Sequence, residues 1–360
     1  MYNESKQIRV AFLCNAASWG GLEMNIARLA QWLAENGHQV VFLCPPQTAV
    51  SDFMATHLMP NLYLYPSKSR LKYFDLLTAS QIGRILARHQ VDSLVIGHSK
   101  DIQLGITVQT FFYNKLKLGY LQQMQVGIAK KDWLHRWMYS KLAFWVAPLP
   151  SVASVTLART TVRPEQIRLI PLCADLAKFK DVRRKRAAAR AQLGLPPDAT
   201  LLTIVGRYDA GKGQIFLVEA LAQLKQRGIE AEILLVGEET KGEEGTYLPM
   251  LKQRIQDLQL LAQVHFRPFM QSIELAYAAS DIFVMASLEE TFGMVTIEAM
   301  ASALPVVGSR AGGTVDLLEE EQAGLFFEPQ NSQSLGESLL KLLQNRMLCG
   351  EKSQKASVLS

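Results

Sequence analysis

Several features that would assign a protein to a compartment are scarce in this sequence. Its 360 residues include four cysteines, Cys14, Cys44, Cys173 and Cys349, whose spacing fits neither a disulfide framework nor a metal site. No apolar run approaches the roughly 20 residues that span a bilayer. The first segment, MYNESKQIRVAFLC, contains no apolar stretch typical of a secretory signal. We therefore expect a cytoplasmic protein with reduced thiols.

Motifs for dinucleotides and for metal-bound nucleotides are also missing. The first glycine-rich loop contains Trp19-Gly20-Gly21 and lacks the GxGxxG fingerprint, so an NAD fold has no direct support. Residues 206–213, GRYDAGKG, nearly match the Walker A pattern, but Gly213 stands where Ser or Thr would bind Mg²⁺. No Asp-x-Asp pair occurs in the chain. We expect no metal and no cofactor, and an ATPase is disfavoured.

Charge is distributed unevenly along a chain of ordinary globular composition, with 49% hydrophobic and 20% charged residues. Residues 1–164 contain 17 Lys and Arg against 8 Asp and Glu, a net charge of +9. Residues 165–360 contain 21 against 25, a net charge of −4. A basic first half indicates an anionic partner, either a membrane surface, a phosphorylated acceptor or nucleic acid, although chance is an alternative. Nucleic acid is disfavoured because no recognition module is present.

Short apolar runs alternate with helical patterns along the whole chain. Residues 8–14 and 201–206 are typical of parallel strands that are covered on both faces, and each such run is followed by a helical pattern. This alternation predicts an α/β protein with two doubly wound parallel sheets and a cleft between them. We place the first domain at residues 1–172, a linker at 173–180 and the second domain at 181–360.

Two charged pairs in the second half are candidates for binding a sugar phosphate. Arg207 offers a bidentate fork and Lys212 a point charge at the start of a predicted helix, which suits a pyrophosphate. Glu290 and Glu298 lie eight residues apart around the predicted start of another helix, where carboxylates suit hydroxyl-rich ligands. The alternative for each of these residues is an exposed surface charge.

His98 directly follows the predicted strand SLVIG, in the row of loops where doubly wound sheets bind ligands. A structural or exposed histidine is the alternative.

Four segments taken together resemble the retaining glycosyltransferases of family 4, which have the GT-B fold. These segments are GGLEMNIARLAQWLAENGHQV, RLIPLCADLAKF, GRYDAGKG and ETFGMVTIEAMASALPVVGSRAGG, and the resemblance covers about residues 8–345. It implies that the substrate is a nucleotide-diphosphate sugar, with UDP the commoner base in the family and GDP the alternative.

The resemblance also implies a role for each matching residue. Arg207 and Lys212 would hold the diphosphate, Glu298 the ribose hydroxyls, and Glu290 the donor sugar, while His98 would assist near the sugar. Gly20 and Gly21 would let the first loop reach the diphosphate, and the base would lie near Arg267 and Pro268. Backbone groups of Phe292, Gly293, Met294 and Val295 would contact sugar and phosphate. The catalytic set is then Glu290, His98, Arg207 and Lys212, and no metal is required.

Three positions depart from the family pattern. Cys173 replaces the usual glycine of the crossing between domains. His98 lies in GHSKD, with glycine where the family often has a second histidine. The final helix that packs back across the first domain in the family is expected to be short or missing.

The acceptor is expected on the first domain, where KSRLKYF, NKLKL and KKDWLHRWMYSKLAFW interleave cations with aromatic residues. This pattern suits anionic headgroups and shallow insertion of aromatic rings, and the alternative is that the aromatic residues are core. The hypothesis is a hexosyltransferase on the inner face of the plasma membrane that extends a lipopolysaccharide-type or capsule-type acceptor. A nucleotide-sugar epimerase and a non-catalytic nucleotide-sugar-binding protein are the alternatives.

Overall fold

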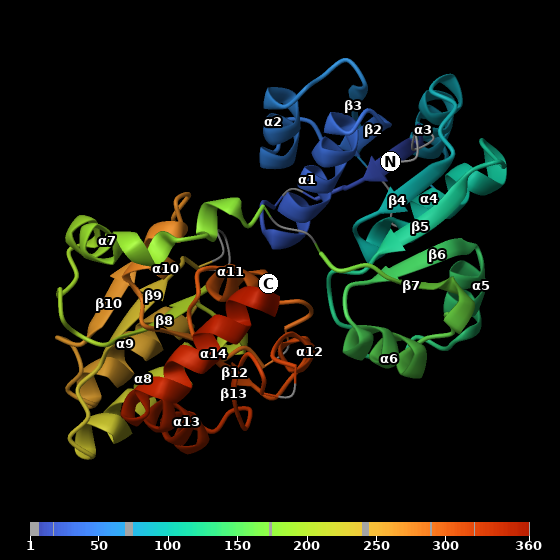
Figure 1. The fold of residues 1–360 in the computed structure, drawn as a ribbon. Helices are drawn as coiled ribbons and strands as arrows, with labels where there is room; N and C mark the ends of the chain where they lie inside the picture. Colours follow the sequence, from blue (N-terminus) through green and yellow to red (C-terminus); the bar gives the residue numbers. More distant parts are fainter. Residues whose placement is uncertain are drawn as a thin grey trace. The chain divides into compact units, whose positions relative to one another are not determined.

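The computed structural model describes residues 7–16, 18–68, 75–172, 175–239, 245–288, 290–319 and 321–359. The chain divides into two compact units, Met1–Cys173 and Ala174–Ser360, and each contains one parallel β-sheet (Figure 1). Cys173 lies outside the described residues, as do most residues of the basic segment KSRLKYF. No helix in the described ranges has both the length and the apolar character needed to cross a membrane.

The first unit has a seven-stranded sheet with the order β3-β2-β1-β4-β5-β6-β7, in which each neighbouring pair is parallel. The strands are β1 (Arg9–Leu13), β2 (Gln39–Cys44), β3 (Leu62–Pro66), β4 (Ser93–Ile96), β5 (Lys117–Leu121), β6 (Leu142–Ala147) and β7 (Ile167–Leu169). The helices are α1 (Gly21–Glu35), α2 (Ala49–Thr56), α3 (Leu76–Arg88), α4 (Ile102–Phe111), α5 (Trp133–Ser140) and α6 (Pro150–Arg159).

Strand β1 shows why its sequence is almost continuously apolar. Val10 and Phe12 pack into one core with helices α1 and α2, whereas Ala11 and Leu13 pack into another with helices α3 and α4. Successive side chains of a strand point to opposite faces, so a strand with helices on both faces needs apolar residues at every position. The predicted doubly wound sheet is confirmed in this unit.

The second unit has a six-stranded parallel sheet with the order β10-β9-β8-β11-β12-β13. The strands are β8 (Leu201–Val205), β9 (Glu232–Val236), β10 (Val264–Arg267), β11 (Ile282–Met285), β12 (Val306–Ser309) and β13 (Gly324–Phe327). The helices are α7 (Arg186–Leu193), α8 (Gln214–Gln226), α9 (Tyr247–Asp257), α10 (Glu274–Ala279), α11 (Met294–Ala301), α12 (Thr314–Leu317), α13 (Ser332–Gln344) and α14 (Arg346–Leu359). Residues of α8, α9 and α13 pack on one face of the sheet, and residues of α10, α11 and α14 pack on the other.

Several parts of the chain were not foreseen. The 14-residue helix α14, which packs against α11 and α13 of the second unit, was not predicted. That a helix crossing the first domain is short or missing stays a prediction. Phe179 lies in the segment expected to be a linker, yet its side chain is buried in the core beside Tyr277. The elements α2, β3, α6, β12, α12 and β13 were not predicted either.

Strand order identifies one position in each sheet where a ligand can bind. The chain runs outward from β1 through β2 to β3 and then resumes at β4, on the other side of β1. It does the same in the second unit, from β8 through β9 to β10 and then to β11. Loops that leave the carboxyl ends of two such strands diverge, and the crevice between them is where open α/β sheets bind ligands.

A partly buried cluster of ions ties α7 to the start of β11. The Asp281 carboxylate accepts hydrogen bonds from Arg190 Nη2 (2.7 Å), Arg186 Nε (3.2 Å) and the amide of Leu201 (2.9 Å). The Arg190 side chain is only 2% exposed, so its charge depends on this carboxylate and on nearby carbonyl groups. The cluster therefore holds α7 against the amino-terminal ends of β8 and β11.

We expect Asp281→Ala to lower the free energy of unfolding of the second unit by about 3–5 kcal/mol, because it leaves a buried guanidinium without its counter-charge. Urea unfolding of the full chain measures this loss. The matched control is Asp198→Ala at an exposed carboxylate near the end of the same helix, for which we expect a change of at most about 0.5 kcal/mol. Equal stability of the two variants would contradict a structural role for the cluster.

Candidate functional site

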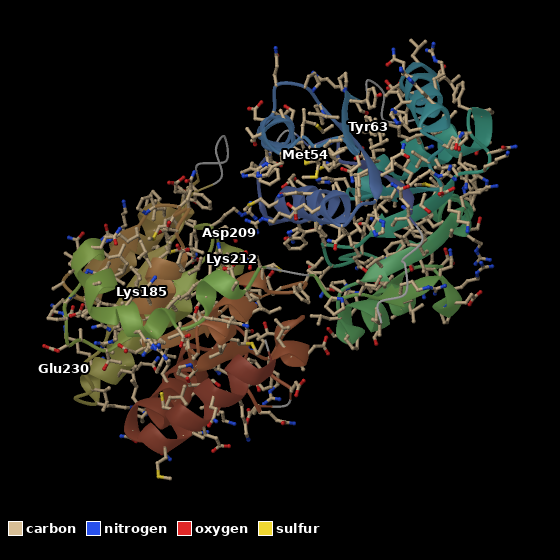
Figure 2. The ribbon with its side chains drawn as sticks, turned by 45° about the horizontal axis from the view of Figure 1, so that its top comes forward. Met54, Tyr63, Lys185, Asp209, Lys212 and Glu230 are labelled. Carbon is tan, nitrogen blue, oxygen red and sulfur yellow. The ribbon has the colours of Figure 1, made fainter. Side chains whose placement is uncertain are left out.

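The loop after β8 is held in a compact shape before α8 begins. It forms a 3₁₀ turn at Ala210–Lys212, and Figure 2 shows Asp209 and Lys212 side by side at this turn, where the Lys212 amide donates to the Asp209 carbonyl (3.1 Å). The buried Gln214 side chain donates to the Arg207 carbonyl (2.7 Å). The segment that resembles a phosphate loop is thus an ordered turn at the start of a helix.

The loop after β11 lies directly against this turn, and Gly213 makes that approach possible. A Cβ at Gly213 would lie 2.3 Å from the carbonyl oxygen of Ala286, and the residue has φ of +70°. The amide of Leu288 donates to the Gly211 carbonyl (2.9 Å). Glycine therefore stands at the Walker A position of Ser or Thr because the backbone of the neighbouring loop occupies the space.

The two loops bring one cation and one carboxylate of the predicted set into contact. Lys212 Nζ lies 2.9 Å from Glu290 Oε2, in an ion pair whose side chains are 27% and 19% exposed. Both residues follow strands that flank the point where the strand order reverses. The pair is thus a partly buried, partly accessible charge couple at the position expected for a ligand.

The backbone of Glu290 is fixed by a third loop, which follows β12. The amide of Gly313 donates to the Glu290 carbonyl (2.7 Å), and a Cβ at Gly312 would lie 2.3 Å from that oxygen. Gly312 also has φ of +55°. No role was predicted for this glycine pair, although its position in AGG after a strand was a usable signal.

Glu298 lies one turn inside α11 and is held by a residue that was not predicted. Tyr277 Oη lies 2.9 Å from Glu298 Oε2 and 3.2 Å from the carbonyl of Val295, and the tyrosine ring is fully buried. Burial and the nearby carboxylate raise the pKa of Tyr277 well above its ordinary value, so the phenol remains a donor. Tyr277 in the pattern ELAYAA resembles an ordinary core residue, which is why sequence alone did not identify it.

Helix α11 begins directly after Gly293, whose φ is +85°. Phe292 is buried before this start, and Met294 and Val295 form the first helical turn. The first N–H groups of a helix have no partner within the helix and carry partial positive charge. This end of α11 can therefore receive an anion or a polar hydroxyl group.

Arg207, Arg267 and Pro268 lie at the same edge of the sheet but in different surroundings. The Arg207 side chain is 61% exposed, with Asp209 at 3.8 Å. Arg267 ends β10, and its guanidinium donates to the carbonyls of Phe266 (2.7 Å) and Leu193, so this side chain is occupied in holding α7. Arg267 and Pro268 can offer a ligand their backbone groups, at the carboxyl end of the edge strand β10.

In the first unit, the structure brings together His98, Gly20 and Gly21 around a buried acid that was not predicted. Gly20 caps α1 and Gly21 begins it, while His98 follows β4. His98 Nε2 lies 3.3 Å from Glu23 Oε1, and Glu23 also accepts from the amide of Gly20 (2.9 Å) and from Ser18 Oγ (3.1 Å). A carboxylate only accepts hydrogen bonds, so the contact places the proton on Nε2 and fixes the orientation of the ring.

Glu23 is only 4% exposed, yet its carboxyl group is ionised at neutral pH in the folded chain. Burial by itself raises the pKa of Glu23, but hydrogen bonds from His98, the Gly20 amide and Ser18 outweigh that effect and hold the pKa below its ordinary value. Glu23 lies in the first turn of α1, where the helix dipole also favours a negative charge.

A carboxyl group whose pKa is lower in the folded state than in the unfolded state stabilises the fold at pH values above its unfolded-state pKa. This stabilisation is lost as the pH falls through the folded-state pKa. The first unit should therefore lose stability as the pH falls below about 4.5, the ordinary value for Glu23. We expect Glu23→Gln to be less stable at pH 7 and to lose less stability on acidification, as measured by urea unfolding between pH 3 and 7. Glu35→Gln, at the exposed end of the same helix, should retain the acid sensitivity of the wild type. Parallel pH profiles for wild type and Glu23→Gln would contradict this role.

Within the residues that the structure describes, no group of three or more His, Cys, Asp and Glu side chains could hold a metal ion. That the reaction requires no metal ion stays a prediction.

Two protein-family models match the chain. The model described as Glycosyltransferase Family 4 matches residues 19–178, and the model described as Glycosyl transferases group 1 matches residues 185–357. Every candidate site residue described above lies inside one of these two ranges.

Curated relatives match part of the chain. It is 29% identical over 222 residues to mannosylfructose-phosphate synthase of Agrobacterium fabrum, covering 60% of this chain and 48% of the relative. It is 33% identical over 187 residues to D-inositol 3-phosphate glycosyltransferase of Rhodococcus jostii, covering 50% of this chain and 40% of the relative. The chain thus spans less than half the length of either relative.

A solved structure with a similar fold is that of Anabaena HepE in complex with UDP. It is 21% identical, the TM-score is 0.84, and the match covers 98% of this chain and 94% of that one. HepE has also been solved in complex with UDP-glucose, with a TM-score of 0.81. The chain belongs to glycosyltransferase family 4 and has the GT-B fold, with two parallel-sheet α/β units.

Proposed function

We propose that this protein is a retaining glycosyltransferase that moves a sugar from a nucleotide-diphosphate sugar to a glycan or glycolipid acceptor without a metal ion. The observation that carries the proposal is the ion pair of Lys212 and Glu290 at the carboxyl ends of β8 and β11. One member suits a phosphate and the other suits sugar hydroxyl groups. Glu298 and the start of α11 lie on the loop and helix that follow Glu290.

Charge development during the reaction explains the need for a fixed cation. The bond between sugar C1 and the diphosphate oxygen breaks, so positive charge builds on the ring and negative charge builds on the leaving diphosphate. Lys212, held in place by its loop, stabilises the negative charge electrostatically, and the exposed fork of Arg207 can close on the same group. The N–H groups at the start of α11 add positive potential.

The acceptor oxygen forms the new bond to C1 on the face that the diphosphate leaves. Its proton passes to the departing phosphate oxygen, so atoms and charge balance without a protein nucleophile. Glu290 accepts hydrogen bonds from donor-sugar hydroxyls, and Glu298, held by Tyr277, accepts from the ribose hydroxyls. His98, oriented by Glu23, contacts the sugar in this scheme.

UDP is the base we propose, and the solved complexes of HepE with UDP and UDP-glucose support it by analogy of fold. GDP is the alternative base. For the acceptor we propose a lipid-linked glycan of the lipopolysaccharide or capsule type, extended at the inner face of the plasma membrane. The net charge of +9 in residues 1–164 supports an anionic acceptor surface.

Ligand-induced stabilisation tests the donor site without needing an acceptor. A ligand at 100 times its Kd stabilises the folded state by about 2.7 kcal/mol, which corresponds to a rise in Tm of roughly 5 °C or more. We expect UDP-sugars and UDP to raise Tm more than UMP does, because Lys212 binds the diphosphate. In Lys212→Ala the advantage of UDP over UMP should largely disappear. No shift with any nucleotide or nucleotide sugar would remove the proposal.

Turnover measurements test the roles of the ion pair in the reaction. We expect Lys212→Ala and Glu290→Ala each to lower kcat by roughly 100-fold or more, by analogy with the loss of a charge-stabilising group. The double variant should lose less than the product of the two effects, because the side chains are in contact.

Arg254 and Glu219 provide a matched control, since they form an ion pair of the same 2.9 Å length on α9 and α8. Arg254→Ala and Glu219→Ala should turn over at the wild-type rate. Unchanged rates in the Lys212 and Glu290 variants would exclude both from the mechanism. An epimerised nucleotide sugar formed without acceptor would identify an epimerase instead.

A further inference from the structure

Helix α5 exposes two tryptophans on the face opposite to its core contacts. Trp133 is 79% exposed and Trp137 is 38% exposed, and residues four apart lie on the same side of a helix. Met138 and Tyr139, on the other side, are buried in the core of the first unit. Two large aromatic side chains on the solvent face of one short helix are unusual in a soluble protein, where exposed apolar groups mark interaction sites.

The loop before α5 extends the same exposed apolar character. Met124 is 63% exposed and Ile128 is 75% exposed. Arg159 Nη1 donates to the carbonyls of Val126 (2.8 Å) and Gly127 (2.6 Å), while the amide of Lys130 donates to the Arg159 carbonyl (2.7 Å). These bonds fix the backbone of the loop on both sides of Ile128, so its exposure is built into the fold.

Cations are interspersed with these apolar residues in the sequence. Residues 122–141 contain Lys130, Lys131, Arg136 and Lys141 against a single acid, Asp132. Asp132 is occupied in capping α5, since it accepts from the amides of Leu134 and His135. Among the described residues, none of the four cations forms an ion pair with a carboxylate. We call Met124, Ile128, Trp133 and Trp137, with these four cations, the α5 surface.

Structure separates this surface from the other basic segments that the sequence suggested. NKLKL, residues 114–118, lies where β5 begins, at the amino end of the strand. The loop that leads to α5 starts where β5 ends, at the opposite edge of the sheet. KSRLKYF falls mostly outside the described residues.

The α5 surface is continuous with the candidate site in the first unit. Gln123, next to Met124, donates from Nε2 to the Leu22 carbonyl (3.1 Å), and its Oε1 accepts from Asn25 Nδ2 (3.1 Å). Leu22 directly precedes Glu23, which contacts His98. The loop that carries Met124 therefore lies against the start of α1, at the edge of the sheet that carries His98.

We propose that the α5 surface docks on an anionic lipid bilayer, with Trp133 and Ile128 inserted at the headgroup level and the four cations on anionic headgroups. Trp is suited to this interface because its ring is apolar and its N–H is polar, and clustered cations are attracted to an anionic leaflet. That the docked bilayer supplies a lipid-linked acceptor to the site rests on the proposed function. Docking of the α5 surface on a bilayer does not depend on the proposed function.

The test is sedimentation of the full chain with vesicles of phosphatidylcholine alone or mixed with phosphatidylglycerol. We expect binding to the mixed vesicles that weakens with added salt, because exposed charges are screened. Lys131→Ala with Arg136→Ala should weaken binding about 25-fold, at about fivefold per cation. Trp133→Ala should weaken binding at least about tenfold.

Matched control variants remove a comparable exposed aromatic side chain and a comparable pair of cations at the amino edge of the sheet. These are Phe111→Ala, at a side chain that is 62% exposed, and Lys115→Ala with Lys117→Ala, at two exposed cations. Each should bind as the wild type does. Brominated lipid chains should quench tryptophan emission in the wild type and much less in Trp133→Ala, which separates insertion from simple adsorption.

Three outcomes would overturn the proposal: no binding to anionic vesicles at low salt, equal loss in the control variants, or a concentration-dependent dimer that Trp133→Ala abolishes. Stabilisation by UDP in the same preparation keeps the two proposals apart. Lost docking with intact UDP stabilisation removes only the α5 surface, whereas docking without any nucleotide binding removes only the donor site.

Discussion

The contact between Lys212 and Glu290 depends on three loops that meet at the carboxyl edge of the second sheet. Gly213 and Gly312 allow these loops to approach, because a Cβ at either would collide with a carbonyl oxygen of a neighbouring loop. Three strand ends thereby fix one ammonium and one carboxylate 2.9 Å apart. Backbone packing of the three loops thus determines where the two charged side chains lie.

An ion pair at a binding site has an electrostatic role before the ligand arrives. Glu290 balances the charge of Lys212, so the partly buried cation has a counter-charge within the protein. In the proposed function, a bound diphosphate replaces Glu290 as the partner of Lys212, which frees the carboxylate for sugar hydroxyl groups. A carboxylate also orients a site residue in the first unit, where Glu23 accepts from His98 and from several other donors.

Sequence patterns predicted the parallel sheets, because strands covered on both faces need apolar residues at every position, as in β1. They did not reveal β3, an edge strand in which exposed Tyr63 alternates with apolar residues and which ends at Pro66. Lys212 and Glu290 could be identified from sequence because each is a charged residue in a loop that follows a predicted strand, where parallel sheets bind ligands. Tyr277 and Glu23 were not identified, because their roles depend on contacts between residues 21 and 75 positions apart in sequence. Helix α14 was not expected because its sequence has few apolar residues at helical spacing.

The most direct measurement is a crystal structure of the chain with bound UDP. Lys212 Nζ should lie within hydrogen-bond distance of a diphosphate oxygen, and the Glu298 carboxylate should accept from the ribose hydroxyls. The Glu290 carboxylate should then have released Lys212 at least in part. UDP bound elsewhere, with the pair of Lys212 and Glu290 unchanged, would contradict the assignment of this edge of the second sheet as the donor site.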